Sequence, residues 1–206
     1  MSKLKIYGTA RSRAFRTMWC ANELGVPFEG DPAFQTFESL KSDAFKKINP
    51  NGKIPAIDDG GTVIWESMAA NLYLVQKHGG LLGPHNAAEY GHILQWSFFG
   101  MTEIEPAALI ILANKMMLPP EKRDQARLDK AVASLAKPLD VLDGALAANG
   151  HLVGGRFTVA DLNVASVLVW AKLAGRAIYE GRPHFSAWSK AVDARPAYKA
   201  SVALMA

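Results

Sequence analysis

The spacing of apolar side chains changes character near residue 80. Before that point, short apolar runs that are typical of strands alternate with stretches of helical spacing. These patterns predict, in order, strand Leu4–Tyr7, a helix carrying Phe15, Met18 and Trp19, strand Pro27–Gly30, helical turns within Glu38–Lys47, the apolar run Ile54–Ile57, strand Thr62–Trp65 and helix Met68–His78. A β-α-β opening followed by β-β-α predicts an α/β domain that begins with parallel pairing.

After a linker at residues 81–86, the period of the apolar positions becomes 3.6 and no strand pattern recurs. Helices are predicted at Ala88–Lys115, Glu121–Asn149, Thr158–Leu173 and Phe185–Arg195, with a short turn after Pro196. Thr158 and Asp161 are expected to form a capping box at the start of the third helix. Pro106 and Pro138 are expected to kink or interrupt the first two, because proline lacks the helical N–H donor. The predicted domains are therefore residues 1–80 (α/β) and 87–206 (all-helical).

The stretch Asn49–Pro55 reads Asn-Pro-Asn-Gly-Lys-Ile-Pro, a series of turn signals that leads into an apolar run. Pro55 has no N–H and favours an extended Ile54. A proline that leads into a strand is expected at the edge of a sheet. There the N–H and C=O of Ile54 would be available to pair with an extended peptide, and the isomer of the Ile54–Pro55 bond stays open.

Glu66 and Ser67 stand where the strand Thr62–Trp65 passes into the helix Met68–His78. Ser67 is expected to be the N-cap, and the start of a helix favours an anion. Glu66 beside it can bind an ammonium group. The pair therefore suits a free α-amino acid end, although a simple cap beside a solvated charge explains the same two residues.

Taken together, Asn-Gly-Lys-Ile-Pro, the two-strand hairpin and Glu66-Ser67 resemble the glutathione-binding half of the cytosolic glutathione transferases, closest to the serine-type bacterial members. The stretch Gly155–Asp161 and the closing segment from Arg195 to Tyr198 are also similar to that family. The resemblance implies a thioredoxin-like N-terminal domain and an all-helical domain that contributes the electrophile pocket. It also implies glutathione as co-substrate, conjugation to small hydrophobic electrophiles, a role in detoxification and a homodimer.

Such an enzyme lowers the pKa of the glutathione thiol, because a free thiol near ~8.5 is only a few per cent ionised at neutral pH. A hydroxyl donor at a helix N-terminus stabilises the thiolate. By the resemblance, Ser12 is the favoured catalytic residue, five residues beyond Tyr7. Tyr7 and Thr9 remain alternatives, whereas Cys20 lies among apolar neighbours and is expected to be a core thiol. Arg16 either adds positive potential near the thiol or points to solvent.

The remaining glutathione contacts follow from the shape of the tripeptide. Its cysteinyl backbone would pair with Ile54 beside Pro55, and its γ-glutamyl end would meet Glu66 and Ser67. Its glycyl carboxylate needs a cation, and the resemblance assigns Lys41 and Lys53 to this role. Leu40 stands where the family often has a histidine. Four further side chains are candidates for the electrophile pocket or for plain core: Trp96, Phe99, Met116 and Met117.

Composition narrows the remaining choices. The net charge of +4 is evenly spread, with 10 basic and 8 acidic residues in 1–80, which does not suggest a nucleic-acid partner. No apolar run reaches the roughly 18–20 residues of a membrane span. With a single cysteine and no Cys/His cluster, no disulfide or metal site is expected, and a reducing cytoplasm fits.

Two alternatives to the transferase remain. One is a non-catalytic protein of the same fold that binds glutathione or apolar ligands. The other is a glutathione-dependent isomerase or peroxidase, although the isomerases of this fold show a Ser-Ser-Cys-Ser type of loop that Thr9–Ser12 lacks.

Overall fold

The computed structural model describes residues 3–36 and 38–205. Contacts group the chain into two units. The first consists of Met1–Gly83 together with Asp193–Ala206, and the second of Pro84–Val192.

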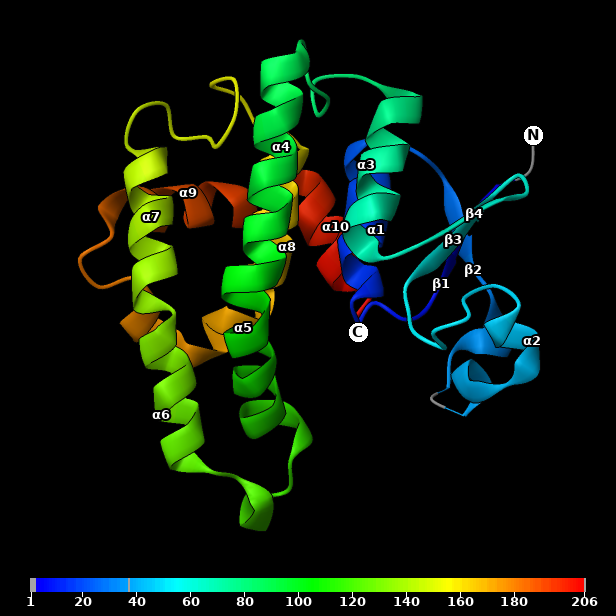
Figure 1. The fold of residues 1–206 in the computed structure, drawn as a ribbon, viewed down its shortest axis with the longest axis horizontal. Helices are drawn as coiled ribbons and strands as arrows, with labels where there is room; N and C mark the ends of the chain where they lie inside the picture. Colours follow the sequence, from blue (N-terminus) through cyan, green and yellow to red (C-terminus); the bar gives the residue numbers. More distant parts are fainter. Residues whose placement is uncertain (1–2, 37, 206) are drawn as a thin grey trace. The chain divides into compact units, whose positions relative to one another are not determined.

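A four-stranded mixed sheet forms the centre of the first unit, in the order β2-β1-β3-β4 (Figure 1). Its strands are β1 (Leu4–Tyr7), β2 (Phe28–Gly30), β3 (Ala56–Asp59) and β4 (Thr62–Trp65). β1 pairs in parallel with β2 and antiparallel with β3, and β3 and β4 form a hairpin. The predicted thioredoxin-like fold is confirmed.

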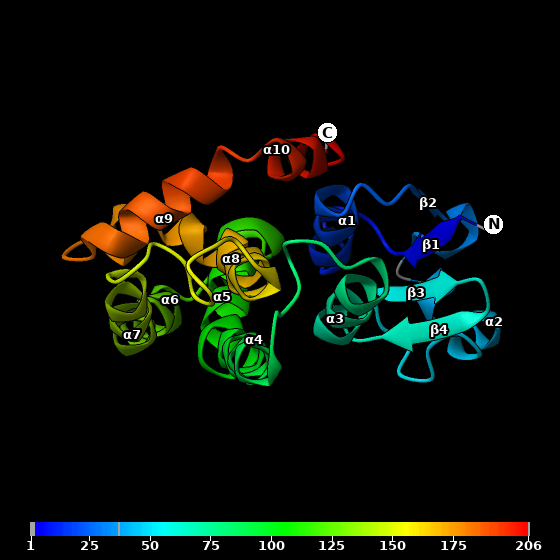
Figure 2. The ribbon, with the colours of Figure 1, turned by 90° about the horizontal axis from the view of Figure 1, so that it is seen from above.

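Helices cover both faces of this sheet. The helices α1 (Ala14–Glu23) and α3 (Ser67–His78) lie side by side on one face, and the short α2 (Asp43–Lys46) lies on the other (Figure 2). Two 3-10 turns, η1 (Pro32–Phe34) and η2 (Ser39–Lys41), accompany α2.

The last helix, α10 (Pro196–Ala203), packs on α1 within the first unit (Figure 2). The ring of Tyr198 makes edge contacts with Phe15 and Trp19. Arg195 donates two hydrogen bonds of 2.7 Å to the Glu23 carboxylate, and this fork-to-fork geometry makes a strong pair.

The expectation that Pro55 leads into an edge strand is wrong. β3 lies between β1 and β4, so it is a central strand. The reason is the position of Pro55, one residue before the strand begins at Ala56. Because Pro55 lies outside the hydrogen-bonded ladder, its missing N–H removes no hydrogen bond from the sheet.

The second unit is entirely helical in its regular structure, apart from one isolated bridge between Val153 and Arg156. Its helices are α4 (Ala87–Phe99), α5 (Glu105–Leu112), α6 (Gln125–Ser134), α7 (Ala136–Leu146), α8 (Val159–Ala171) and α9 (Pro183–Asp193). The short turns η5 (Pro120–Lys122) and η6 (Lys172–Ile178) join α5 to α6 and α8 to α9. The predicted all-helical half is confirmed.

A wider π-helical turn, η3 (Gly100–Ile104), connects α4 to α5, and a second, η4 (Ala113–Met117), follows α5. Pro106 sits in the first turn of α5, where its missing N–H is accommodated by the change of hydrogen-bond pattern. The helical run Ala87–Met117 is long and apolar enough to cross a membrane by length and composition alone, but 44% of its most apolar window is buried in the structure. A long, apolar and partly buried helix is also typical of the core of a helical bundle.

Helix α8 is the core of the second unit, since eleven of its thirteen residues are buried. The predicted capping box at its start is present. The hydroxyl of Thr158 accepts the N–H of Ala160, and the Asp161 carboxylate accepts the N–H of Thr158. Asp161 also accepts hydrogen bonds from the Leu152 N–H and from Trp188 Nε1.

Candidate active site

The loop between β1 and α1 carries Ser12 just before the first helical residue, Ala14. The Ser12 Oγ donates to the Thr9 carbonyl oxygen at 2.7 Å and accepts from the Ala14 N–H at 3.1 Å. The N-cap position of α1 is Arg13, so Ser12 lies one residue before it, and its half-buried hydroxyl binds the N–H of the first helical residue. Its one proton can turn from Thr9 to another acceptor while the bond from Ala14 remains.

Tyr7 lies in a different environment. Its ring makes edge contacts with Phe34 and Phe45, in a buried cluster that also contains Leu40 and Ala56. Burial, together with the charges of two aspartates, raises the pKa of the Tyr7 phenol. The side chains of consecutive strand residues point to opposite faces, so Tyr7 faces away from the Ile6 side of the sheet.

The Ser12 loop and the loop before β3 approach each other at Gly8. A Cβ on Gly8 would lie 2.9 Å from Ala14 Cβ and 3.0 Å from Ile54 Cβ, and the φ of Gly8 is +119°. Only a residue without a side chain fits there. The Ile54–Pro55 peptide bond is cis, and Pro55 is buried. In the described residues, no backbone hydrogen bond outside the helices and strands engages Ile54.

Asn49 holds the loop that follows it. Its Nδ2 donates to the Lys53 carbonyl oxygen at 2.6 Å, and its Oδ1 accepts the Asn51 N–H at 3.0 Å. Asn49 is 2% exposed, so these bonds are shielded from water. The sequence marked it only as a turn residue.

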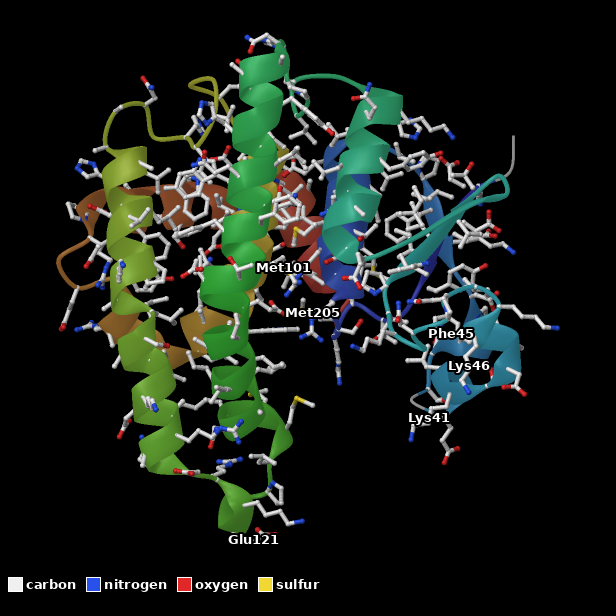
Figure 3. All side chains as sticks on the ribbon, viewed as in Figure 1. Lys41, Phe45, Lys46, Met101, Glu121 and Met205 are labelled. Carbon is white, nitrogen blue, oxygen red and sulfur yellow. The ribbon has the colours of Figure 1, made fainter. Side chains whose placement is uncertain are left out.

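The two predicted lysine ligands come from adjacent turns. A Cβ on Gly52 would lie 3.2 Å from the Leu40 carbonyl oxygen, so the loop that carries Lys53 touches the turn that ends in Lys41. Both lysines are exposed, and Lys41 lies on the segment around α2 (Figure 3). Leu40, where a histidine was noted as frequent, is buried in the cluster around Tyr7.

The prediction that Ser67 caps α3 is wrong. Glu66 occupies the N-cap position with a φ of +73°, and Ser67 is the first residue of the helix. The strand-to-helix turn is therefore one residue shorter than the Ser-cap pattern suggests. Glu66 is exposed, whereas Ser67 is 4% exposed.

Arg16 reaches the start of α3 from the neighbouring helix. Its Nη1 lies 3.5 Å from Ser67 Oγ, and the side chain is 1% exposed. The sequence left its direction open. Arg16 and the buried Cys20 are four residues apart and therefore lie on the same face of α1. This spacing was the feature of the sequence that could have indicated that Arg16 is buried. Cys20 is fully buried, and burial raises the pKa of its thiol, as expected for a core residue.

The candidates for the electrophile pocket divide into two kinds. Trp96 is buried and packs edge-on against Phe99 in α4. Met116 and Met117 are 68% and 66% exposed in η4, so they are not core residues.

Comparisons with known proteins show the family of this chain. The sequence pattern of the "Glutathione S-transferase, N-terminal domain" matches residues 2–76, and that of the "Glutathione S-transferase, C-terminal domain" matches residues 106–196. Glutathione S-transferase 3 of Zea mays is 35% identical, and the match covers 98% of this chain and 95% of that protein.

Two solved structures extend the likeness to the fold. Glutathione transferase F7 from Populus trichocarpa superposes with a TM-score of 0.88 at 28% identity, covering 98% of this chain and 99% of the other. The theta class glutathione S-transferase from Xanthomonas axonopodis pv. citri, solved with glutathione bound, gives 0.84 at 29% identity over 98% of each chain. The chain belongs to the glutathione S-transferase family. It is a glutathione transferase, which conjugates glutathione to electrophiles.

Proposed function

We propose that this enzyme is of the serine type and that Ser12 activates the glutathione thiol. The observation that supports this is the place of the Ser12 hydroxyl, half-buried at the start of α1 with a proton that can be redirected. The positive end of the α1 dipole adds to the stabilisation of a thiolate at that point. Together, one hydroxyl donor and one helix start lower a thiol pKa by on the order of two units.

The two alternatives fit less well. The Tyr7 ring is enclosed by the Phe34 and Phe45 rings, so its phenol belongs to the cluster on the α2 side. Thr9 contributes its carbonyl oxygen to Ser12, which makes it a partner of the serine hydroxyl. We therefore assign the thiolate to Ser12.

The tripeptide main chain would lie along Ile54 beside Pro55. The close approach at Gly8 fixes Ile54 against the loop that carries Ser12, so the sulfur can reach the hydroxyl while the main chain pairs with Ile54. The γ-glutamyl ammonium would meet Glu66 and its carboxylate the start of α3 at Ser67.

Lys41 and Lys53 would bind the glycyl carboxylate. They stand on two exposed turns that touch at Gly52 and Leu40. Leu40 is buried and cannot contribute to binding. The glycyl carboxylate would therefore be bound by the two exposed lysine charges alone, and salt weakens interactions between exposed charges.

We further propose that the enzyme acts as a cytoplasmic homodimer on small hydrophobic electrophiles. The exposed large apolar side chains include Val63 and Trp65 on β4 and Tyr90 and Phe98 on α4. Exposed apolar surface of this kind marks interaction sites. Light scattering of wild type and of the double variant Trp65→Lys with Phe98→Lys tests the dimer. A wild-type monomer would refute it.

The test of the thiol assignment compares wild type with Ser12→Ala, using Tyr7→Phe as the matched hydroxyl control. Conjugation of glutathione to an aromatic halide gives the rate, and the ultraviolet absorbance of the bound thiolate gives the thiol pKa. We expect Ser12→Ala to retain glutathione while the thiol pKa rises by at least about one unit, which is about 1.4 kcal/mol. Tyr7→Phe should titrate as wild type does.

An unchanged titration in Ser12→Ala would refute the role of Ser12. A wild-type protein that retains glutathione without conjugating it would instead favour the non-catalytic binding protein. These two results are distinguishable because the first concerns one variant and the second the wild type.

A further inference from the structure

The Ser12 turn, residues 9–12, closes on the Thr9 carbonyl oxygen. This oxygen accepts the Ser12 N–H at 3.0 Å and the Ser12 hydroxyl at 2.7 Å. Ala10 and Arg11 are therefore the two central residues of the turn, with Ala10 buried and Arg11 exposed. Because Ser12 is the last residue of the turn, the orientation of the turn decides where the Ser12 hydroxyl lies.

Arg11 connects this turn with a segment that is distant in the sequence. Its Nε donates a 2.9 Å hydrogen bond to the carbonyl oxygen of Met205, 194 residues further on. Met205 lies just beyond α10 (Figure 3), and its N–H donates to the Val202 carbonyl oxygen at 2.9 Å. Carbonyl groups at the end of a helix lack partners within the helix, and the negative end of the helix dipole favours an arginine there. Arg11 thus supplies a donor to the end of α10 from within the Ser12 turn.

Contacts with α1 fix the position of α10 itself. Asn22 Nδ2 donates to Ser201 Oγ at 2.7 Å, and Ser201 is fully buried. The ion pair of Arg195 and the ring contacts of Tyr198 hold the rest of α10 on α1. The end of α10 is therefore a fixed point to which the Ser12 turn is hydrogen-bonded.

We propose that Arg11 is a positioning residue for the hydroxyl that activates the thiol. By holding the turn against the end of α10, Arg11 keeps the Ser12 hydroxyl where it can donate to the glutathione sulfur. Arg11 acts through Ser12, so its role rests on the one proposed for Ser12. Residues 195–205 then belong to the support of the active site, although they are the last described part of the chain.

Two substitutions separate the hydrogen bond of Arg11 from its charge. Arg11→Gln places an amide N–H donor as many bonds from the backbone as the arginine Nε, so it keeps the donor and loses the charge. Arg11→Met has a similar reach with neither donor nor charge. Arg11 is exposed, so neither substitution leaves a cavity in the core.

The measurement is the pKa of the bound glutathione thiol, from the ultraviolet absorbance of the thiolate, together with kcat and KM. For Arg11→Met we expect the thiol pKa to rise by about 0.5–1 unit, a loss of thiolate of about threefold to tenfold, which is the effect of losing one hydrogen bond. The kcat should fall by the same factor below the thiol pKa and approach that of wild type above it. Arg11→Gln should restore the wild-type titration.

The KM for glutathione in Arg11→Met should stay within about twofold of wild type, because the groups assigned to the tripeptide backbone and its ends are unchanged. A residue that merely stabilises the fold would not shift the thiol pKa while leaving KM unchanged.

A second pair of variants tests the contribution of α10. Val202 is 39% exposed in the last turn of α10, where proline removes a helical N–H and displaces the end of the helix. Val202→Pro should raise the thiol pKa as Arg11→Met does, and Val202→Ala should titrate as wild type does. The double variant Arg11→Met with Val202→Pro should shift the pKa no further than either change alone, because both remove the same contact.

Equal shifts of the thiol pKa in Arg11→Met and Arg11→Gln would show that the charge acts, and would overturn the positioning role. No shift in either variant would do the same, and additive shifts with Val202→Pro would overturn the support by α10. Should Val202→Pro not fold, the comparison of the two Arg11 variants decides alone.

The background of Ser12→Ala separates this role from the role of Ser12. There, Arg11→Met should cause no further shift of the thiol pKa, and a further shift would overturn the step through Ser12. If Ser12→Ala alone titrates as wild type does, the role of Ser12 fails. If Ser12→Ala shifts the pKa and Arg11→Met does not, only the role of Arg11 fails.

Discussion

Replacing Gly8 by alanine is expected to damage both stability and glutathione binding. Two separate effects contribute. The φ of +119° is a region that L residues rarely adopt, and holding alanine there costs about 1–3 kcal/mol. The new Cβ would also lie 2.9 Å from Ala14 Cβ and 3.0 Å from Ile54 Cβ. Overpacking of this kind costs about 1–3 kcal/mol more.

Gly61 offers the matched control. It has a φ of +95° in the hairpin turn between β3 and β4, and a Cβ there would meet nothing within 4 Å. Gly61→Ala should therefore show only the backbone effect. The difference in unfolding free energy between the two variants isolates the contact of Gly8 with Ala14 and Ile54.

The assay is urea unfolding combined with the KM for glutathione. We expect Gly8→Ala to lose about 2–6 kcal/mol and Gly61→Ala about 1–3 kcal/mol. Because Ile54 must move away from the Ser12 loop, the KM of Gly8→Ala should rise more than about tenfold, whereas Gly61→Ala keeps the wild-type KM. Equal losses of stability with an unchanged KM would show that Gly8 does not hold Ile54 in place.

Three further predictions concern other parts of the chain. Tyr7→Phe should leave conjugation within about twofold of wild type, since the phenol is not assigned to the thiol; a loss of tenfold or more would return the role to Tyr7. Asp161→Ala should lower the free energy of unfolding in urea by more than about 3 kcal/mol. The variant leaves several buried donors without a partner, including Trp188 Nε1, and each such donor costs about 1–3 kcal/mol. Arg156 holds the pKa of Glu89 at about 2 by a direct hydrogen bond, below its ordinary value. The ion pair therefore stabilises the fold above about pH 4.5, and this stabilisation is lost as the pH falls toward 2. In Arg156→Met, Tm should fall less steeply with decreasing pH over this range than in wild type. The same acid dependence of Tm in both proteins would contradict the prediction.

Much of the fold follows from local patterns. The strands β1 and β4 lie where alternation and apolar runs placed them, and Thr158 and Asp161 form the predicted capping box. These features depend on residues close together in the sequence, which is why a single sequence predicts them.

What the sequence did not determine depends on neighbours distant in the chain. Pro55 precedes a central strand because β4 folds back beside β3, and a local rule for proline does not contain that pairing. Glu66 takes the N-cap position with a positive φ, against the preference for serine. The direction of Arg16 was undecided because it depends on α3, fifty-one residues away.

The candidate site shows the same division. The motif Asn49–Pro55 identified the loop, but the contacts that fix it came from the structure. Asn49 binds Lys53 across the turn, and Gly8 packs on Ile54 from another part of the chain. Turn signals indicate where the chain bends, but the residues that each turn contacts are determined by the tertiary structure.

The return of α10 to α1 makes the first unit discontinuous, with the second unit inserted between its two pieces. On the ribosome, Phe15 and Trp19 emerge long before Tyr198, their partner in the finished protein. The first unit therefore cannot complete its packing until the second has been synthesised. A fragment ending at Gly83 would leave those two rings without their cover, so biosynthesis of an active enzyme is coupled to synthesis of the final helix.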